Sequence, residues 1–321
     1  MGLVLSMAVS NVGDGAEVLV SPMTFPATIT AILNVRAKPV FVDCDESGLI
    51  NMDIVENMRI LPEKLKAIMP VHYTGASCDM RRVMAFAQRH NIKVIEDAAH
   101  AFGTEFVDRS EGDQPGRRYK IGTIGDLTVF SLYPTKNITS AEGGIVTTRR
   151  GDWAERIRAL SCHGLSLNAW GRHGNGPIKH YEVMYPGYKA NMSDVHAAIG
   201  LAQLKRWPEI RKKRSDIWNL YEDAFGFKEP GHSQHLFTLR VKNRDIFRDK
   251  MHELGIGTGL QFRPVHLEPG YHFLGHKKGD FPVAERIGDR TVSLPISSIM
   301  TTEQAKRVVE VALRLREEPN G

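Results

Sequence analysis

The sequence predicts an α/β fold with a mainly parallel sheet, and three observations support this. Short β-branched and aromatic runs alternate with amphipathic helical stretches, the order typical of βαβ units. The chain has 321 residues, of which 42% are hydrophobic and 25% charged, enough for one large α/β domain and a smaller one. It contains no internal repeat and no low-complexity tract that would favour a solenoid or a disordered chain.

The first two thirds of the chain carry the alternation most clearly. Expected strands, taken in chain order, are 17–21, 38–42, 66–70, 93–96, 127–130 and 145–148. Expected helices are 27–34, 79–90 and 153–161, and a Gly-, His- and Asn-rich loop follows over 163–179. Ser193 is placed to cap a long helix that Pro208 interrupts, with a second helical segment running to about 225.

A smaller α/β unit is expected after the glycines at 226 and 231. Its strands are predicted at 236–241 and 294–295, and its helices at 246–254 and 302–315. We therefore expect a large domain over residues 1–225 and a small C-terminal domain over 226–321.

Composition and charge narrow the function classes. The net charge of +5 comes mainly from scattered Lys and Arg; the run Arg211–Arg214 is expected to be a solvated helix face, so nucleic-acid binding is disfavoured. A positive field suits a polyanionic small substrate such as a nucleotide diphosphate. The three cysteines form no disulfide or zinc pattern, which predicts no metal site and suits a reducing cytoplasm. The N-terminus lacks the basic region of a signal peptide, and no run reaches the roughly 18 apolar residues of a membrane span.

One lysine is a candidate for chemistry because of where it falls. Lys136 follows the expected strand 127–130 and precedes a Gly pair, while Asp97 and His100 follow the neighbouring expected strand. In parallel sheets, ligands bind at the carboxyl ends of strands. An aspartate there can keep a pyridine nitrogen protonated while a lysine holds the ring's aldehyde as a Schiff base. The alternatives are a solvent-facing lysine, an aspartate that caps the next helix and a structural histidine.

Blocks along almost the whole chain resemble the DegT/StrS family of sugar aminotransferases. "VIEDAAHAFGT" followed by "FSLYPTKNITSAEGG" carries the resemblance most strongly. Further blocks occur in the family's order: "SPMTFPAT", "KPVFVDCD", "KAIMPVHYTG", "RALSCHGLS", "PGYKANMSDVHAAIGLAQL" and "GIGTGLQFRPVHLEPGYH". The resemblance implies a fold type I enzyme that uses pyridoxal 5′-phosphate (PLP).

The resemblance is nearest to the branch that aminates C4 of nucleotide sugars, including the enzyme that makes UDP-4-amino-4-deoxy-L-arabinose for lipid A. It implies transfer of an amino group, with L-glutamate as the expected donor, to a 4-keto nucleotide sugar for cell-surface polysaccharide or lipid A synthesis. A cytoplasmic homodimer with shared active sites and small-molecule substrates is expected. A related group that has histidine in place of the lysine dehydrates sugars, and Lys136 argues against that chemistry here.

The same resemblance assigns roles to individual residues. Lys136 would be the Schiff-base lysine and Asp97 the partner of the pyridine nitrogen, with His100 on one face of the ring. Phe25 would stack on the other face, Ser131 would bond the phosphate, and Asn191 would reach the partner subunit's phosphate. The expected sugar-nucleotide side is lined by Phe262, Arg263 and His266. Each has a plain alternative: Phe25 as core, Ser131 as a turn residue, Asn191 as a helix-start residue, and Arg263 as a surface cation.

The sequence also departs from the family. Met1 aligns inside a helix that in the family follows a phosphate-binding segment, so a preceding strand and lead-in helix are expected to be missing. Residues 108–120 are predicted to form a surface loop, and 224–235 is shorter than usual. The alternative hypothesis is therefore a truncated, non-catalytic remnant that binds a nucleotide sugar or a partner chain without turnover. A nucleotide-binding oxidoreductase is less favoured because no G-x-G-x-x-G follows any expected strand.

Overall fold

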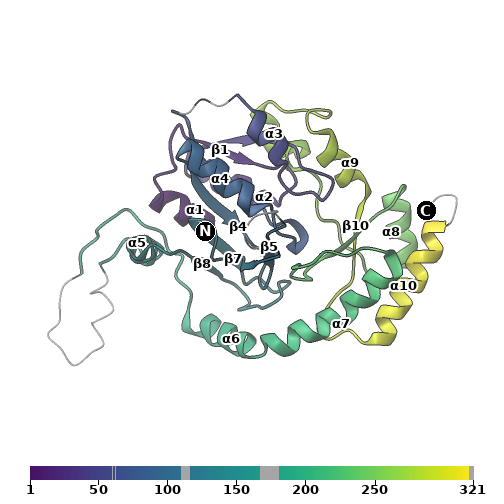
Figure 1. The fold of residues 1–321 in the computed structure, drawn as a ribbon. Helices are drawn as coiled ribbons and strands as arrows, with labels where there is room; N and C mark the ends of the chain where they lie inside the picture. The colour runs from purple at the N-terminus through teal and green to yellow at the C-terminus, as the bar shows by residue number, and fades with distance from the viewer. Residues whose placement is uncertain (60, 62, 110–115, 167–180, 318–321) are drawn as a thin grey trace.

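A central six-stranded sheet organises the larger part of the molecule (Figure 1). The structure is a computed structural model that describes residues 1–59, 61, 63–109, 116–166 and 181–317. In spatial order the strands are β2 (Lys38–Phe41), β1 (Glu17–Val20), β3 (Leu65–Met69), β4 (Lys93–Asp97), β7 (Leu127–Ser131) and β8 (Gly144–Thr147). Neighbouring strands are parallel except β7 and β8, which are antiparallel. The predicted α/β class with a mainly parallel sheet is confirmed.

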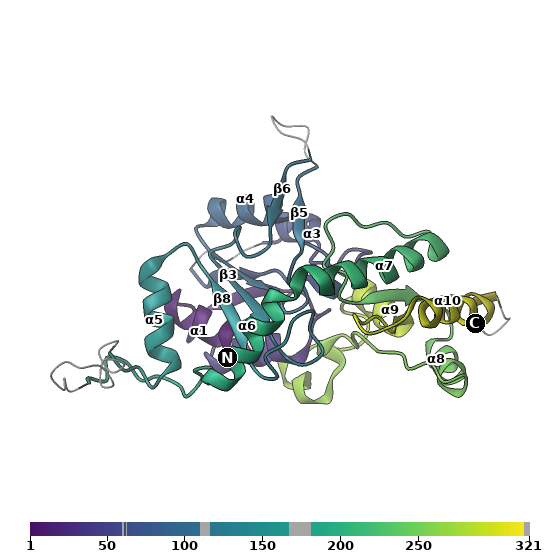
Figure 2. The same ribbon diagram turned by 90° about the horizontal axis from the view of Figure 1, so that it is seen from below.

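Helices cover both faces of this sheet, as the view in Figure 2 shows. On one face, α1 (Gly2–Val9) packs on β4, β7 and β8 and contacts α2 (Pro26–Asn34) and α5 (Gly151–Ser161). On the other, α4 (Met80–His90) packs on β3 and β4 beside α3 (Met52–Asn57). Asp79 caps α4 by accepting a hydrogen bond from the Arg82 amide at 3.1 Å. The sequence did not predict α3, which is a six-residue helix.

Two helices lead from the sheet to the C-terminal unit. Ser193 caps α6 (Asp194–Lys205) as predicted, and α7 (Trp207–Phe225) begins at the predicted interruption with Pro208 in its first turn. The C-terminal unit pairs β9 (Phe237–Arg240) with β10 (Thr291–Leu294) in an antiparallel ribbon, with α8 (Arg244–Glu253), α9 (Pro282–Arg290) and α10 (Thr302–Glu317) around it. In the described part of the chain, short 3-10 turns cover Tyr73–Gly75, Val265–Leu267 and Pro269–Leu274.

Two apolar clusters form the core, and they interleave along the chain. The larger surrounds the six-stranded sheet but also takes in Val265 and part of α9. The smaller joins β9, β10, α8 and α10 to Ile217, Trp218 and Tyr221 of α7. The half of α7 before residue 225 thus packs with the C-terminal unit, while the segment around Val265 returns to the sheet. The division at 225/226 stays a prediction.

The prediction of a surface loop over 108–120 is wrong for its last three residues. Arg118–Lys120 forms β6, which pairs antiparallel with β5 (Glu105–Val107), because alternate side chains of this polar stretch, such as Tyr119, can pack inward. Most of the predicted loop over 163–179 lies outside the described residues, as do 110–115.

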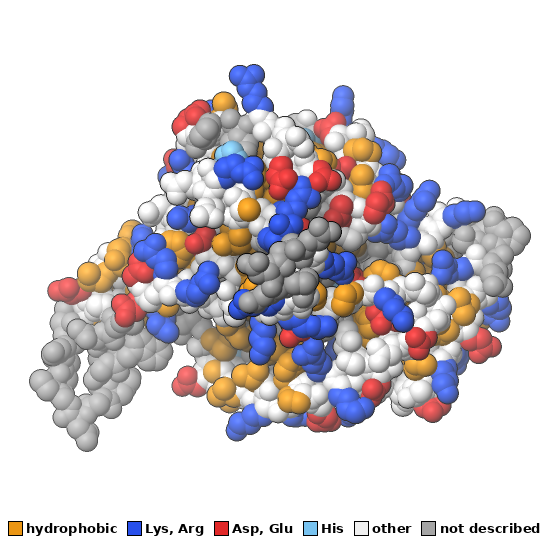
Figure 3. All heavy atoms as spheres, in the orientation of Figure 1, with side chains coloured by type: hydrophobic (Ala, Val, Ile, Leu, Met, Phe, Trp, Pro, Cys, Tyr) orange, Lys and Arg blue, Asp and Glu red, His pale blue; other side chains and the backbone are white. Residues whose placement is uncertain are grey.

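The run Arg211–Arg214 is not a wholly solvated face. Arg214 is 6% exposed, whereas its three neighbours in the run are exposed. Basic and acidic side chains intermingle over the face drawn in Figure 3. No described helix is both long and apolar enough to cross a membrane.

Candidate active site

Asp97 and Lys136 meet at the carboxyl edge of the sheet because their strands are parallel neighbours. Asp97 is the last residue of β4 and pairs in register with Val129 of β7. Past the end of β7, the chain turns through a loop over 132–140, in which the Lys136 amide donates to the Tyr133 carbonyl at 2.9 Å. Both side chains therefore lie over the same edge, as the sequence predicted.

The loop that holds Lys136 returns tightly to β8. The amide of Ser140 donates to the Leu132 carbonyl at 3.0 Å, and the amide of Leu132 donates to the Gly143 carbonyl at 3.0 Å. Gly143 has φ +151°, and a Cβ there would lie 2.4 Å from Met192 Cε and 2.6 Å from Ser140 Oγ. A side chain at this position would push aside the side chains of Met192 and Ser140 and would hold a backbone conformation that L residues rarely adopt, so the position favours glycine.

The Asp97 carboxylate is oriented by two donors. Thr28 Oγ1, in the first turn of α2, donates to Asp97 Oδ2 at 2.7 Å, and the Ala99 amide donates to Oδ1 at 3.1 Å. The backbone is held as well, since the His72 amide donates to the Asp97 carbonyl at 3.0 Å. A carboxylate accepts about four hydrogen bonds, so this one can take a further donor from the site.

Lys136 Nζ makes no hydrogen bond or ion pair with any described residue, and its side chain is half-buried. Burial lowers the pKa of the Lys136 amine from its ordinary 10.5, and the negative charge of Asp97 opposes that shift. The amine therefore loses its proton more readily than an ordinary lysine.

Aromatic and imidazole rings line the space beside this pair. The ring of Phe262 stacks on His100 with centroids 5.6 Å apart and lies 5.8 Å from Phe25. Burial lowers the pKa of His100 well below 6.5, and Lys136 and His232 lower it further, so the ring is neutral. The structure thus brings Phe262, expected on the substrate side, next to the two residues expected to flank the cofactor ring.

Three other predicted site residues, Ser131, Asn191 and Arg263, lie in different parts of the molecule. Ser131 ends β7, and its hydroxyl accepts from the Tyr133 amide at 3.3 Å. Asn191 precedes α6, and its Oδ1 accepts from Lys189 Nζ at 2.5 Å. Arg263 is exposed, with Nε 3.9 Å from Glu268 Oε1.

His266 does not lie open to the site. It is 1% exposed, and its Nε2 is 3.0 Å from Glu285 Oε1 on α9. The family resemblance placed it on the substrate side, and the sequence did not predict α9, which supplies its partner. Its placement favours a packing role over contact with the sugar nucleotide.

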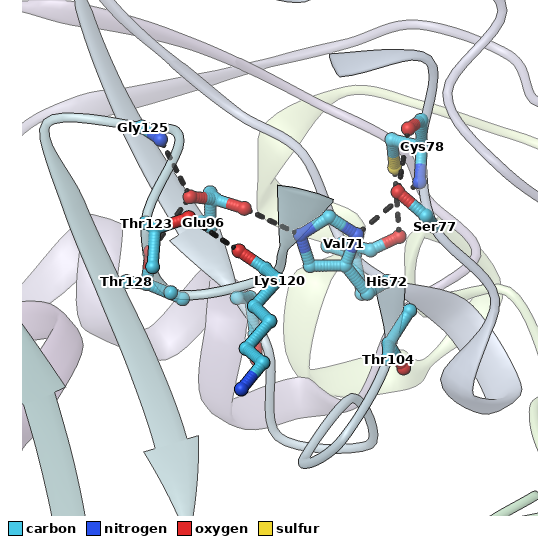
Figure 4. A network of polar contacts seen from close by, with 12 residues as sticks. Val71, His72, Ser77, Cys78, Glu96, Thr104, Lys120, Thr123, Gly125 and Thr128 are labelled. Atoms are coloured by element: carbon cyan, nitrogen blue, oxygen red, sulfur yellow. Dashed lines mark hydrogen bonds and ion pairs between the residues drawn. The ribbon is translucent and has the colours of Figure 1, made fainter. Parts of the chain in front are cut away.

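A buried network around Glu96, the residue before Asp97, was not predicted (Figure 4). Glu96 has 0% exposure, and its carboxylate accepts from His72 Nε2 at 2.9 Å, the Gly125 amide at 2.7 Å and Thr128 Oγ1 at 2.6 Å. His72 Nδ1 accepts from the Cys78 amide at 3.2 Å, so its proton is on Nε2. Burial opposes ionisation of Glu96, but these hydrogen bonds outweigh it and lower the pKa of the carboxyl below 4.5.

Arg214 and the segment it holds were also missed. Its guanidinium donates to the carbonyls of Gln234 (2.8 and 3.0 Å), His235 (2.6 Å) and Ile296 (3.2 Å). Burial lowers its pKa to about 10. The helical spacing of Ile210, Arg214 and Ile217 places the arginine on the buried stripe of α7, a signal that the sequence did contain.

The fold and this pair define a class of enzyme. A lysine with a lowered pKa and an anchored carboxylate at the carboxyl edge of an α/β sheet are the groups that fold type I enzymes use to hold PLP. The residues present fit that cofactor. Lys136 Nζ has no partner among the described residues and is available to its aldehyde, Asp97 has acceptor capacity for its ring nitrogen, and the rings beside them supply flat apolar surface.

The model of the DegT/DnrJ/EryC1/StrS aminotransferase family matches residues 1–313. The chain belongs to this family, and its cofactor is PLP. The predicted family and cofactor are thereby confirmed.

Similar proteins support the assignment. An uncharacterized protein of Methanocaldococcus jannaschii, MJ1066, is 42% identical over 98% of this chain and 83% of its own length. The spore coat polysaccharide biosynthesis protein SpsC of Bacillus subtilis is 40% identical over 96% of this chain and 81% of its own.

Solved structures agree in fold. Spr1654 of Streptococcus pneumoniae, assigned as a sugar aminotransferase, has a TM-score of 0.88 in its PMP form at 28% identity, covering 98% of this chain and 85% of that one. An aminotransferase from Psychrobacter cryohalolentis has a TM-score of 0.84 at 28% identity, covering 97% and 83%.

Proposed function

We propose that this enzyme transfers an amino group from an amino acid, with L-glutamate as the expected donor, to C4 of a 4-keto nucleotide sugar. The observation that carries the proposal is a half-buried Lys136 with no partner among the described residues, close enough to the anchored Asp97 for its charge to act on the amine. The names of SpsC and Spr1654 support a sugar substrate in polysaccharide synthesis. A lipid A intermediate is one member of the proposed substrate class.

The residues divide the proposed chemistry among them. When bound, PLP supplies an electron sink that stabilises negative charge on the carbon losing a proton. Lys136 Nζ, whose pKa is lowered by burial, takes the α-proton of the donor and later returns a proton to C4 of the sugar. Asp97 keeps the ring nitrogen protonated, and Thr28 holds Asp97 in the orientation this requires. An arginine could not replace the lysine because it does not deprotonate.

Binding roles follow from position. His100 and Phe25 would hold the two faces of the cofactor ring, and Phe262, whose ring contacts both of them, would line the substrate side. Ser131, at the end of β7, binds the cofactor phosphate. Exposed Arg263 offers its guanidinium fork to a phosphate of the sugar nucleotide.

We further propose a cytoplasmic homodimer in which a second copy covers α6. None of the 12 residues of α6 is buried, although several are large and apolar. Val195 is 71% exposed, Leu201 61% and Leu204 47%, and apolar side chains are visible at the surface in this region of Figure 3. Exposed apolar area of this kind is typical of an interface. Asn191, just before α6, would then reach the partner's site.

The substrate is tested in two half-reactions. PLP-loaded protein is mixed with L-glutamate, and the formation of 2-oxoglutarate is followed; the protein is then desalted and offered UDP- and dTDP-linked 4-keto sugars. We expect mass spectrometry to show conversion of the ketone to an amine, and NMR to place the amine at C4.

Lys136→Ala should lose both half-reactions, while Lys242→Ala, a change at an exposed lysine, should retain them. If the protein releases 2-oxoglutarate but converts none of the keto sugars, the sugar assignment is overturned. Loss of both half-reactions in the unaltered chain would favour a non-catalytic protein.

A further inference from the structure

Residues 231–236, which link α7 to β9, cross the edge of the sheet beside the active site. The Ser233 amide donates to the Gly75 carbonyl at 3.1 Å, and the Leu236 amide donates to the Thr74 carbonyl at 3.1 Å. We call residues 231–236 the crossing segment. It belongs to the C-terminal part of the chain, yet its hydrogen bonds go to the loops of the large sheet.

A glycine makes this approach possible. Gly75 has φ +114°, and a Cβ there would lie 2.0 Å from Ser233 Oγ and 3.0 Å from the His100 carbonyl. In its absence, Ser233 Oγ donates to that carbonyl at 2.7 Å. The crossing segment is thus bonded directly to His100 of the proposed cofactor site.

His235 of the crossing segment is bonded to the residue next to Lys136. Asn137 Nδ2 donates to the Ser233 carbonyl at 2.9 Å, which leaves Asn137 Oδ1 as an acceptor. His235 Nδ1 lies 3.0 Å from that oxygen and therefore carries the proton, so the second ring nitrogen, Nε2, is an acceptor. His235 is 4% exposed and Asn137 6%, so water competes little for this bond.

The His235 ring is neutral and packs on a ring of the site. Its centroid is 4.8 Å from that of His100. Burial lowers the pKa of His235 well below 6.5, and His100, Lys136, Arg214 and His232 lower it further. These four neighbouring side chains are basic, so a protonated His235 ring would have no carboxylate to pair with among them.

We propose that His235 is a positioning residue of the active site. Its bond to Asn137 fixes the loop that carries Lys136, and its ring holds His100 in place, so one side chain sets the geometry on both sides of the reacting lysine. As a neutral, buried ring it also keeps water and a second positive charge away from Lys136. The proposal rests on the proposed function in assigning Lys136 as the reacting amine.

The tautomer gives the first test. In apoprotein labelled with ¹⁵N-histidine, we expect His235 to stay in the Nδ1–H form across the range around pH ~6.5 in which an ordinary histidine titrates. Titration of His235 in that range, or a proton on Nε2, would overturn the proposal.

Paired variants test the positioning role. His235→Gln can place an amide N–H against Asn137 Oδ1, whereas His235→Phe keeps ring volume without the hydrogen bond. The measured quantity is the rate at which Lys136 of apoprotein is reductively methylated as a function of pH, mapped by mass spectrometry. The Phe variant loses the bond that fixes the loop of Lys136, so we expect the loosened loop to expose the amine to water and raise its pKa by about half a unit or more. Labelling at neutral pH should then slow roughly 3-fold. The Gln variant should recover most of the wild-type rate.

Two controls separate the outcomes. His252→Phe, at an exposed histidine of α8, should leave the Lys136 rate unchanged. In holoprotein, we expect His235→Phe to lower kcat about 10-fold or more, with a smaller change in KM for the donor, as when a reacting group is misplaced. Equal labelling of Lys136 in wild type and both His235 variants would overturn the positioning role. Because labelling uses apoprotein, wild type that labels as expected but does not turn over would contradict only the proposed function.

Discussion

Replacing Glu96 by glutamine tests the buried network around it. Glutamine keeps the shape of the side chain, and its carbonyl oxygen can still accept from Gly125 and Thr128. Its amide N–H₂, however, faces the proton on His72 Nε2. If His72 changes tautomer to accept there, its Nδ1 proton meets the Cys78 amide instead, so one buried donor is unsatisfied in either case.

The expected cost follows from these contacts. One unsatisfied buried donor costs about 1–3 kcal/mol, and the two retained bonds weaken because their acceptor is no longer charged. Glutamine costs less to bury than a carboxylate, which offsets part of the loss. We expect Glu96→Gln to lower the free energy of unfolding at neutral pH by about 2 kcal/mol.

The sign of the pH dependence is also fixed. The pKa of Glu96 is lower in the folded protein than its ordinary 4.5, so its stabilisation is present above pH 4.5 and is lost as the pH falls through the folded pKa. The difference between wild type and Glu96→Gln should therefore be constant near neutrality and shrink below pH 4.5.

Urea denaturation of apoprotein over a pH series measures that difference. Glu310→Gln, at an exposed position of α10, is the matched control and should change stability little. The reasoning would be refuted by a difference below about 0.5 kcal/mol at neutral pH, the range of ordinary surface changes. It would also be refuted by a difference that does not depend on pH.

Three further predictions concern other parts of the molecule. Asp97→Asn should still bind PLP but lower kcat by about 10²- to 10³-fold, the loss typical of one electrostatic stabiliser; near-normal kcat in steady-state assays would contradict the role. Arg214→Met leaves one buried and two part-buried carbonyls without their donor and should cost about 2–4 kcal/mol in urea denaturation, whereas exposed Arg211→Met should cost little. Leu201→Glu on α6 should convert a dimer to monomers in analytical ultracentrifugation, and a wild-type monomer would argue against the proposed interface.

The sequence predicted the parts of the fold that depend on local pattern. The strands of the large sheet were found because buried parallel strands read as apolar runs between turn residues. The meeting of Asp97 with Lys136 was predictable because both follow the carboxyl ends of strands that pair in parallel. The roles of the two residues came from the family resemblance.

What the sequence did not predict depends on contacts between distant segments. Arg214 was expected in solvent because its neighbours are basic, but two of its partners lie on the crossing segment, some 20 residues further along the chain, and the third is Ile296. The sequence did not single out Glu96, because its role as a buried hydrogen-bond acceptor depends on distant residues. His72 follows β3, and Thr128 belongs to β7. His235 carries no motif of its own, and only the folded chain places it against Asn137.

The most direct test of the central claim is the absorbance spectrum of protein mixed with PLP, before and after borohydride, followed by peptide mapping. The account predicts a visible band that reduction abolishes, with the reduced cofactor attached at Lys136, and no such attachment in Lys136→Ala. Attachment at another lysine, or no band in folded protein, would contradict the claim that Lys136 and Asp97 hold the cofactor.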